Sequence, residues 1–381
     1  MSFDILPALQ GGCTGFAKME KKLKWVEVFE TLQRRLREGV YSSGTPLPSE
    51  EAIVRHFKVS RITAVKAMDE LRRRGLVYRK RGSGTFATRL ARRESGRLGL
   101  IFPSLAFGEI FPVICQSLAQ AAQRDGFSFV FGDVYASSPA KRAKKACEVA
   151  RMFVEQHVAG VVFQPLAFLK APDRITKEIL RMLDEANIPV VLIDRYVSGG
   201  GTTHDFVGID NLRAGRDIGA HLVSAGAKRI AFLRRPNCAS VIRDRIDGVM
   251  SALLGTNARG FVVTAEPGDV KAVAQHFSST RSRPDAVVCE SDYVAAQFNA
   301  TLGRLGLSVP GDVMLAGFDD VRIAATMTPP LTTVRQPCED LARVAYQALR
   351  DRLNDATIPA RHILLPAPLV MRESTRGRGN G

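Results

Sequence analysis

Two groups of side chains in this sequence have the types and the spacing for chemistry, and the first lies near the amino terminus. Ser60, Arg61 and Thr63 open a helical pattern, and a basic turn that contains Arg81 and Gly82 follows soon after that pattern ends. Hydroxyl and guanidinium groups at the start of an exposed helix form hydrogen bonds with base edges in a major groove. A glycine-containing basic turn brings positive charge and backbone amides to phosphate oxygens. The spacing therefore predicts an interface with double-stranded DNA.

The second group of polar side chains follows apolar strands in the longer, carboxyl-terminal part of the chain. Ser104, Arg195, Ser291 and Asp319 each come directly after such a strand. Because ligands of parallel α/β sheets bind at the carboxyl ends of the strands, we expect these side chains to face one crevice. Carboxylates accept hydrogen bonds from hydroxyl groups, and a guanidinium donates several in a fixed geometry. The set therefore suits a polyhydroxyl ligand.

Some candidates in the second group also have a purely structural interpretation. Phe111 is as consistent with a core residue as with an aromatic platform for a sugar ring. Asp292 is equally consistent with a helix cap that never meets ligand. Arg195, Arg245 and Asp319 are the stronger candidates, because a charged side chain is costly to bury without a partner.

The elements that position the first group are three short helices and a hairpin. Apolar residues recur with helical spacing over residues 25–36. Ser49 and Ser60 are typical caps for two further helices. Two short strands then flank the glycine turn, at 76–78 and 85–87. This order of elements predicts a winged helix-turn-helix.

The elements that position the second group alternate between apolar strands, such as 98–102 and 189–193, and helices, such as 211–224. Strands that are apolar on both faces are typical of parallel sheets covered by helices on both sides. About ten strands predict two such sheets in two lobes. The expected fold class is therefore α/β, with an amino-terminal winged helix-turn-helix and a two-lobed, periplasmic-binding-protein-like domain.

The domain boundaries follow from changes in composition. The segment before the first apolar strand of the body is polar and basic, as in a linker between domains. We predict a flexible tail, a winged helix-turn-helix domain, a linker, a two-lobed domain for effector binding and dimerisation, and a second tail, at residues 1–20, 21–87, 88–97, 98–376 and 377–381.

The positive charge of the chain is unevenly distributed. The formal net charge is +16, and the segment from Lys18 to Arg97 holds 21 Lys and Arg against 9 Asp and Glu. Residues 98–381 hold 33 against 28. A basic head on a nearly neutral body indicates a polyanionic partner for the head. A solvated charged surface is the alternative that charge alone leaves open.

Other features argue against several classes of protein. Six cysteines are scattered without a Cys-x-x-Cys or Cys/His cluster, so neither a metal site nor a disulfide framework is expected, and no cofactor is implied. No apolar stretch approaches the roughly 18 residues of a transmembrane helix. Residues 1–17 lack the pattern of a secretory signal peptide. We expect a cytoplasmic protein without a membrane partner, with Met19 as an alternative translation start to Met1.

The amino-terminal part resembles the DNA-binding domain of the GntR family. The motifs that carry the resemblance are Leu47-Pro48-Ser49-Glu50, Val59-Ser60-Arg61, the run from Glu70 to Val77, and the run from Gly82 to Phe86. The resemblance implies DNA contacts from the caps, the third helix and the wing, namely Ser49, Ser60, Arg61, Thr63, Lys66, Arg81 and Gly82. Glu51 and Val65 stand where the family usually has arginine. We therefore expect either an unusual operator or a compensating contact from Lys66.

The body resembles the LacI/GalR repressors and the periplasmic sugar-binding proteins. The matching motifs are Ile188-Pro-Val-Val-Leu-Ile-Asp-Arg195, Val207-Gly-Ile-Asp-Asn211, Gly226-Ala-Lys-Arg-Ile-Ala231, Arg245-Ile-Asp-Gly248, Val309-Pro-Gly-Asp312, Gly317-Phe-Asp-Asp320 and Pro329-Pro-Leu-Thr-Thr-Val-Arg-Gln336. The resemblance implies an effector pocket lined by Ser104, Phe111, Arg195, Arg245, Ser291, Asp319 and Gln336. Ser291 stands where the family often has asparagine.

The two resemblances together imply a ligand-responsive regulator of transcription. The expected form is a homodimeric repressor that a carbohydrate or related metabolite releases from its operator, and the combination resembles the arabinose-repressor arrangement. We do not expect an enzyme, because the sequence contains no Gly-x-Ser-x-Gly motif and no lysine in a convincing cofactor-binding motif. Two alternatives stay open: an enzyme with a fused regulatory DNA-binding head, and a sugar-binding protein without DNA function.

Overall fold

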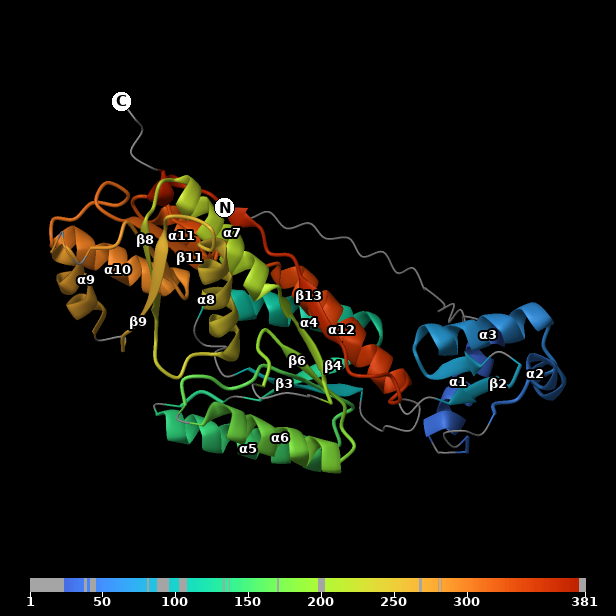
Figure 1. Cartoon of the computed structure of the whole chain (residues 1–381). Helices are drawn as coiled ribbons and strands as arrows, with labels where there is room; N and C mark the ends of the chain where they lie inside the picture. The colour runs from blue at the N-terminus through green and yellow to red at the C-terminus, as the bar shows by residue number, and fades with distance from the viewer. Residues whose placement is uncertain are drawn as a thin grey trace, which may run out of the picture.

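The computed structural model describes a small head and a two-lobed body (Figure 1). The described residues are 24–37, 40–41, 46–80, 82–87, 96–102, 108–132, 134–136, 138–169, 171–197, 203–266, 269–279, 281 and 283–376. None of the helices in these ranges is long and apolar enough to cross a membrane.

The head is a winged helix-turn-helix, as the pattern of caps and apolar residues predicts. Its elements are α1 (Lys24–Arg37), α2 (Glu50–Phe57), α3 (Arg61–Arg73), β1 (Val77–Lys80) and β2 (Gly84–Ala87). The Ser49 hydroxyl caps α2 by accepting from the Ala52 amide, and the Ser60 hydroxyl caps α3 by accepting from the Thr63 amide, both at 3.2 Å. The antiparallel hairpin follows directly and closes a small apolar core with the three helices. The predicted linker residues up to 95 lie outside the described residues.

The first lobe of the body contains a six-stranded sheet in the order β13-β7-β6-β5-β3-β4, in which every neighbouring pair is parallel. Helices α4 and α12 pack together on one face of this sheet (Figure 1). Helices α5 and α6 pack together on the opposite face. The elements are β3 (Arg97–Ile101), α4 (Ile110–Arg124), β4 (Ser128–Gly132), α5 (Pro139–Glu155), β5 (Val161–Phe163), α6 (Pro172–Glu185), β6 (Val190–Ile193), β7 (Asp205–Ile209), α12 (Cys338–Asn354) and β13 (His362–Leu365).

The second lobe contains a six-stranded sheet in the order β14-β12-β11-β10-β8-β9. Its elements are α7 (Asn211–Ser224), β8 (Arg229–Arg234), α8 (Ser240–Ala252), β9 (Arg259–Thr264), α9 (Val270–Ser278), β10 (Ala286–Cys289), α10 (Asp292–Arg304), β11 (Met314–Asp319), α11 (Arg322–Thr326), β12 (Thr332–Arg335) and β14 (Leu369–Val370). The strands are parallel, as expected, except at one edge, where β14 pairs with β12 in the antiparallel sense. The chain reaches this edge through the short connection between β13 and β14, so β14 runs in the direction opposite to that of β12.

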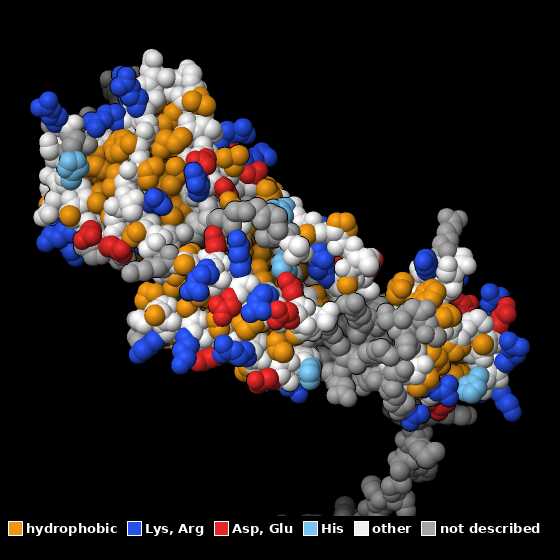
Figure 2. All heavy atoms as spheres, turned by 60° about the horizontal axis from the view of Figure 1, so that its bottom comes forward, with side chains coloured by type: hydrophobic (Ala, Val, Ile, Leu, Met, Phe, Trp, Pro, Cys, Tyr) orange, Lys and Arg blue, Asp and Glu red, His pale blue; other side chains and the backbone are white. Residues whose placement is uncertain are grey.

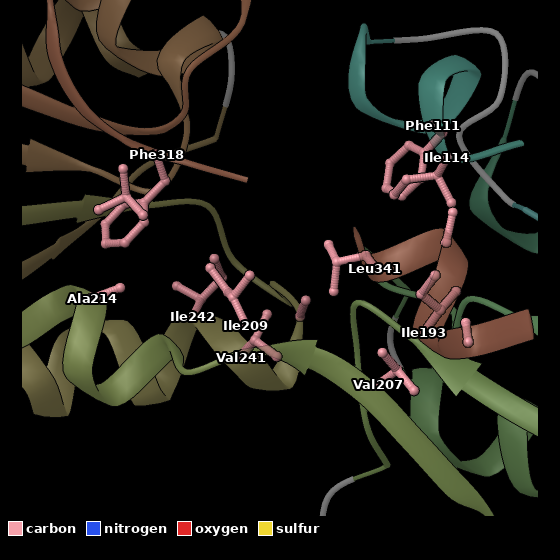
Figure 3. Close-up of a cluster of buried hydrophobic side chains, with 14 of the residues drawn as sticks. Phe111, Ile114, Ile193, Val207, Ile209, Ala214, Val241, Ile242, Phe318 and Leu341 are labelled. Carbon is pink, nitrogen blue, oxygen red and sulfur yellow. The ribbon is translucent and has the colours of Figure 1, made fainter. Parts of the chain in front are cut away.

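The chain passes between the lobes at three places, after β7, after β12 and after β13. A large apolar cluster runs along the same region and includes residues of both lobes. Figure 3 shows Phe111, Ile193 and Val207 on the side of the first lobe and Ala214 and Phe318 on the side of the second. The lobes are therefore joined by backbone and by packed side chains at one edge of the space between them.

Helices α7 and α8 pack very closely, because glycine occupies the contact on both. A Cβ atom at Gly215 would overlap the backbone oxygen of Arg245, and one at Gly248 would overlap the backbone oxygen of Leu212. Backbone atoms on a helix cannot shift as a flexible side chain does. This contact therefore fixes where α8 carries Arg245 toward the space between the lobes.

Substitution of Gly215 by alanine should destabilise the second lobe, because the new methyl group forces α7 and α8 apart. We expect Gly215→Ala to lower the free energy of unfolding by about 1–3 kcal/mol, as overpacking of a core contact does. Chemical denaturation followed by circular dichroism measures this change. Gly303→Ala in α10 is the matched control, since open space surrounds that position. A control variant that loses as much stability as Gly215→Ala would contradict the packing argument.

Candidate nucleic-acid interface and ligand crevice

The start of α3 presents a small set of side chains to solvent. The Ser60 and Thr63 hydroxyl groups lie 2.9 Å apart and hydrogen-bond to each other, so both are held in place by the cap. Arg61 is exposed, and Ile62 is 81% exposed beside it. An exposed isoleucine at the start of such a helix suits contact with the methyl group of thymine. Ile62 was not expected here from the sequence, since an apolar residue in a helical pattern is usually part of the core.

The wing hairpin leaves its glycine turn open. Gly82 has a φ of +75°, in the left-handed region that favours glycine, and no atom lies within 4 Å of the position of a Cβ there. Stacking of Tyr78 on Phe86 supports the hairpin from one side. Arg81 lies outside the described residues, so its predicted contact with DNA stays a prediction.

Several other cations of α3 have partners within the head. The Lys66 ammonium lies over the Trp25 ring, 4.8 Å from its centre, so this residue anchors α3 to α1 through a cation–π contact. Arg73 and Arg74 both form ion pairs with Glu70, and the Arg73 hydrogen bond lowers the pKa of Glu70 to about 2. The arginines at the end of α3 therefore have a structural role, which leaves Arg61 as the exposed cation at its start.

The two roles of Ser60 and Arg61 can be separated by their effects on stability. Ser60→Ala should destabilise the head by about 1 kcal/mol, because the first turn of α3 loses its cap. Arg61→Ala should leave stability within about 0.5 kcal/mol, because the side chain is exposed. Thermal melting of the full chain, monitored through Trp25 fluorescence, tests both. Equal losses in the two variants would show that Arg61 has a structural role instead.

The crevice between the lobes is a cavity of about 680 Å³ with an adjoining deeper hollow of about 100 Å³. Side chains of both lobes line this space, at or near the carboxyl ends of the strands as predicted. From the first lobe they are Phe111, Arg142, Phe168 and Arg195, and from the second Arg234, Arg235, Arg245, Ser291, Asp319 and Gln336. All the predicted effector residues within the described ranges thus face one space. Ser104 lies outside the described residues.

The centre of the deeper hollow is the buried guanidinium of Arg245. Its Nε donates to the Asn211 side-chain oxygen at 2.8 Å, and its Nη1 donates to the Glu290 carbonyl oxygen at 2.8 Å. Its Nη2 lies 4.0 Å from the Asp319 carboxylate, and the group stacks on the Phe318 ring. These contacts leave Arg245 fixed in orientation and only partly neutralised.

Asp319 shares this hollow and has an unusual backbone. Its φ of +116° lies in the region where non-glycine residues are rare. The strained turn directs the carboxylate toward Gln336, whose Nε2 donates to it at 3.3 Å. Burial raises the pKa of the Asp319 carboxyl above its ordinary range, although the charge of Arg245 opposes the shift. The site therefore holds a carboxylate that gains from any further hydrogen-bond donor.

Arg195 enters the crevice from the first lobe. Its guanidinium lies 3.3 Å from Asp194, and Gln164 donates a hydrogen bond to the same carboxylate at 2.8 Å. Burial lowers the pKa of Arg195, and the positive charges of Arg235 and Arg245 lower it further, while Asp194 opposes them. Arg195 is therefore one of several cations crowded around the same space.

Arg235 and Phe168 also form part of the crevice wall, although neither was expected from the sequence. Arg235 forms an ion pair with the buried carboxylate of Glu290 and stacks on Phe168, with its guanidinium carbon 3.9 Å from the ring centre. Phe168 comes from the first lobe and Arg235 from the second, so this contact spans the crevice. Arg235 comes directly after an apolar strand, so the rule that identified Arg195 and Ser291 could also have identified Arg235.

Phe111 and Ser291 have double roles. Phe111 is 9% exposed and belongs to the apolar cluster, yet it also lines both parts of the crevice. Ser291 caps α10 by accepting from the Val294 amide at 3.5 Å and lines the same space. Asp292 accepts hydrogen bonds from Thr333 and from the Val321 amide, which makes it a buried support of the second lobe.

Two protein families match separate parts of the chain. Residues 25–87 match the bacterial regulatory proteins of the gntR family, and residues 220–375 match a periplasmic binding protein-like domain. The HTH-type transcriptional regulator MalR of Streptomyces coelicolor is 30% identical over 298 residues, which cover 75% of this chain and 83% of that protein. This chain belongs to the HTH-type transcriptional regulators. The regulator therefore combines a gntR-type head with a periplasmic-binding-protein-like body, and the expected resemblance and fold class are confirmed.

One further relative and one solved structure match this regulator over more than nine-tenths of its length, and a second structure matches about three quarters of it. The arabinose metabolism transcriptional repressor of Geobacillus stearothermophilus is 25% identical over 373 residues, covering 94% of this chain and 99% of that repressor. The solved complex of the transcriptional regulator CelR with cellobiose has the same fold, with a TM-score of 0.64 at 23% identity over 92% of this chain and 99% of that one. Transcription regulator GntR from Chromobacterium violaceum gives a TM-score of 0.59 at 26% identity, over 74% and 100% of the two chains.

The raised pKa of Asp319 predicts a pH-dependent cost to stability. Because the folded pKa exceeds the ordinary value of 3.8, the folded state holds its proton more tightly, and stability falls as the pH rises through that interval. We expect Asp319→Asn, which is neutral at every pH, to raise the melting temperature at pH 7.5. The gain should shrink as the pH approaches 4. A gain that is constant between pH 4 and pH 8 would rule out the ionisation as its cause.

Proposed function

We propose that this regulator is a homodimeric repressor that binds a DNA operator through its heads and is released by a sugar or related metabolite. The proposal depends above all on one observation: predicted ligand residues from both lobes face a single crevice, in a chain that also carries a gntR-type head. Relatives named arabinose and ribose repressors support it, as does the sugar complex of CelR. We place the protein in the cytoplasm, where its operator lies, and assign it no catalytic activity.

In this proposal the ligand acts by changing the angle between the lobes. Arg195 lies in the first lobe and Arg245 and Asp319 lie in the second, so a ligand that contacts all three is bound best when the lobes close. Gln336 sits in a segment that passes between the lobes and also faces the ligand space. A ligand with higher affinity for the closed state shifts the population toward it, and a coupling of about 1–3 kcal/mol between sites is enough for a useful switch.

Self-association is supported by apolar surface on the second lobe. Figure 2 shows hydrophobic side chains gathered on one face of this lobe. Leu254 is 80% exposed and Val262 on the edge strand β9 is 43% exposed. Exposed apolar side chains beside an unpaired strand edge favour a protein partner, and a second copy of the chain gives the twofold arrangement that an inverted repeat requires.

The DNA part of the proposal is tested with Arg61→Ala. We expect this variant to bind an operator fragment at least about tenfold more weakly, because a base or phosphate contact worth about 1–3 kcal/mol is lost. Effector affinity should not change. Fluorescence anisotropy with labelled operator DNA measures the effect. Arg181→Gln is the matched control, since Arg181 is exposed on α6 and pairs with Glu185. Identical operator affinity in wild type and Arg61→Ala would remove α3 from the interface.

The effector part is tested with Asp319→Ala. This variant should bind operator DNA but should not release it when the inducing metabolite is added, because Arg245 loses its carboxylate partner and the ligand loses an acceptor. Anisotropy titrations with and without metabolite give the release curve. Release at the wild-type metabolite concentration would place the effector elsewhere.

A further inference from the structure

The crevice contains more positive than negative charge. Carboxylates on its wall are already matched: Glu290 pairs with Arg235, Asp194 with Arg195, and Asp319 with Arg245. Glu109 also lines the space, and it accepts from the Arg322 backbone amide at 2.7 Å and pairs with the Arg322 side chain at 3.8 Å. Two further cations of the wall, Arg142 and Arg234, pair with no carboxylate in the part of the chain that the structure describes.

Arg142 and Arg234 approach the cavity from different lobes. Arg142 lies in the first turn of α5, whose start is capped by Ser138, and Arg234 is the last residue of β8. The Nε atom of each is buried and has no hydrogen-bond partner among the described residues. The Arg234 side chain makes one weak contact within the described residues, from Nη1 to the Cys238 sulfur at 3.3 Å. Neither guanidinium forms an ion pair with a described carboxylate.

An unmatched buried donor on a charged group is costly, so its retention on a cavity wall indicates a partner that arrives from outside. A neutral sugar offers hydroxyl oxygens, which are modest acceptors for a guanidinium. A phosphate or carboxylate offers charge-assisted hydrogen bonds and restores charge balance. The helix start of α5 adds favourable potential for an anion on the side of Arg142.

We propose that the effector of this regulator carries an anionic group, which Arg142 and Arg234 bind together from opposite lobes. This inference rests on the proposed function, because it takes the crevice as the effector site. The hydroxyl-bearing part of the ligand lies deeper, against Arg195, Arg245 and Asp319. A phosphorylated sugar and a sugar acid both have this chemistry, and neutral sugars do not.

The arrangement also gives the anion a direct role in closure. Without ligand, Arg142 and Arg234 present like charges from the two lobes, and this repulsion favours an open crevice. An adjoining hollow of about 890 Å³ is lined by Arg142 and Arg235, which also line the crevice, and by the exposed Arg174. Its wall contains one acidic residue among those described, Glu266. An anion that accepts from both lobes turns the repulsion into attraction, and so favours the closed state.

The test compares full-length wild type with the double variant Arg142→Gln/Arg234→Gln, and uses Arg181→Gln as the matched surface control. Pyrophosphate is the first probe, because it contains the anionic chemistry without a sugar. We expect it to raise the melting temperature of the body in wild type and in the control, and to do so much less in the double variant. The heads are identical in all three proteins, so anion binding by the basic head cancels in the comparison.

The second arm uses matched ligand pairs in calorimetry: glucose with glucose 6-phosphate, and galactose with galacturonate. The charged member should bind more tightly to wild type, and the double variant should reduce that preference at least about tenfold. The phosphate pair and the carboxylate pair separate the two sources of negative charge. Without ligand, the melting temperature of the double variant should be no lower than that of wild type, because the variant lacks the two unmatched guanidinium groups. If Arg142 and Arg234 instead stabilise the fold, the double variant melts at a lower temperature than wild type.

Two outcomes overturn the inference: an equal response to pyrophosphate in wild type and double variant, or tighter binding of the neutral members. The proposed function fails differently. If a neutral sugar releases the full-length protein from its operator, the proposed function stands and the anionic effector is wrong. If wild type does not bind operator DNA at all, the proposed function is wrong, whatever the crevice binds.

Discussion

The fixed position of the Arg245 guanidinium is the constraint on which the crevice depends. A buried cation must be held by several acceptors, and Arg245 takes them from the start of α7, from the turn after β10 and from the end of β11. The close packing of α7 and α8 at Gly215 and Gly248 leaves little freedom in where α8 presents this side chain. The strained turn at Asp319 then completes the arrangement. Backbone contacts outside the crevice thus determine the electrostatics within it.

The sequence was sufficient to predict the parts of the molecule that follow from local periodicity. Ser49 and Ser60 cap their helices as expected, because a cap depends on residues only three positions apart. The two lobes followed from apolar strands that alternate with helices. The convergence of Ser291 and Asp319 also followed, since both come after strands of the second lobe's sheet, and the carboxyl ends of parallel strands meet at one edge. Arg195 follows a strand of the first lobe's sheet and faces the same crevice from the other side. The DNA contacts assigned to the head remain predictions.

Features that depend on distant partners were not predictable from the pattern. The antiparallel strand β14 is only Leu369–Val370, too short to give a period. Phe168 lies in none of the predicted motifs, and its role emerges only when Arg235 of the other lobe stacks on it. Lys66 illustrates the same limit, because its contact with Trp25 joins two helices that are far apart in sequence. Such cation–π contacts between distant segments are a property of the folded chain alone.

The late position of β13 and β14 has a consequence for biosynthesis. β13 joins the sheet of the first lobe and β14 joins that of the second, although both follow every other strand in the chain. On the ribosome, neither sheet is complete until residues 362–370 have emerged, whereas the head needs nothing beyond β2 for its own core. In a newly made chain, the head can therefore fold long before the body is complete. A messenger RNA truncated near its 3′ end yields a folded head without a complete effector-binding body.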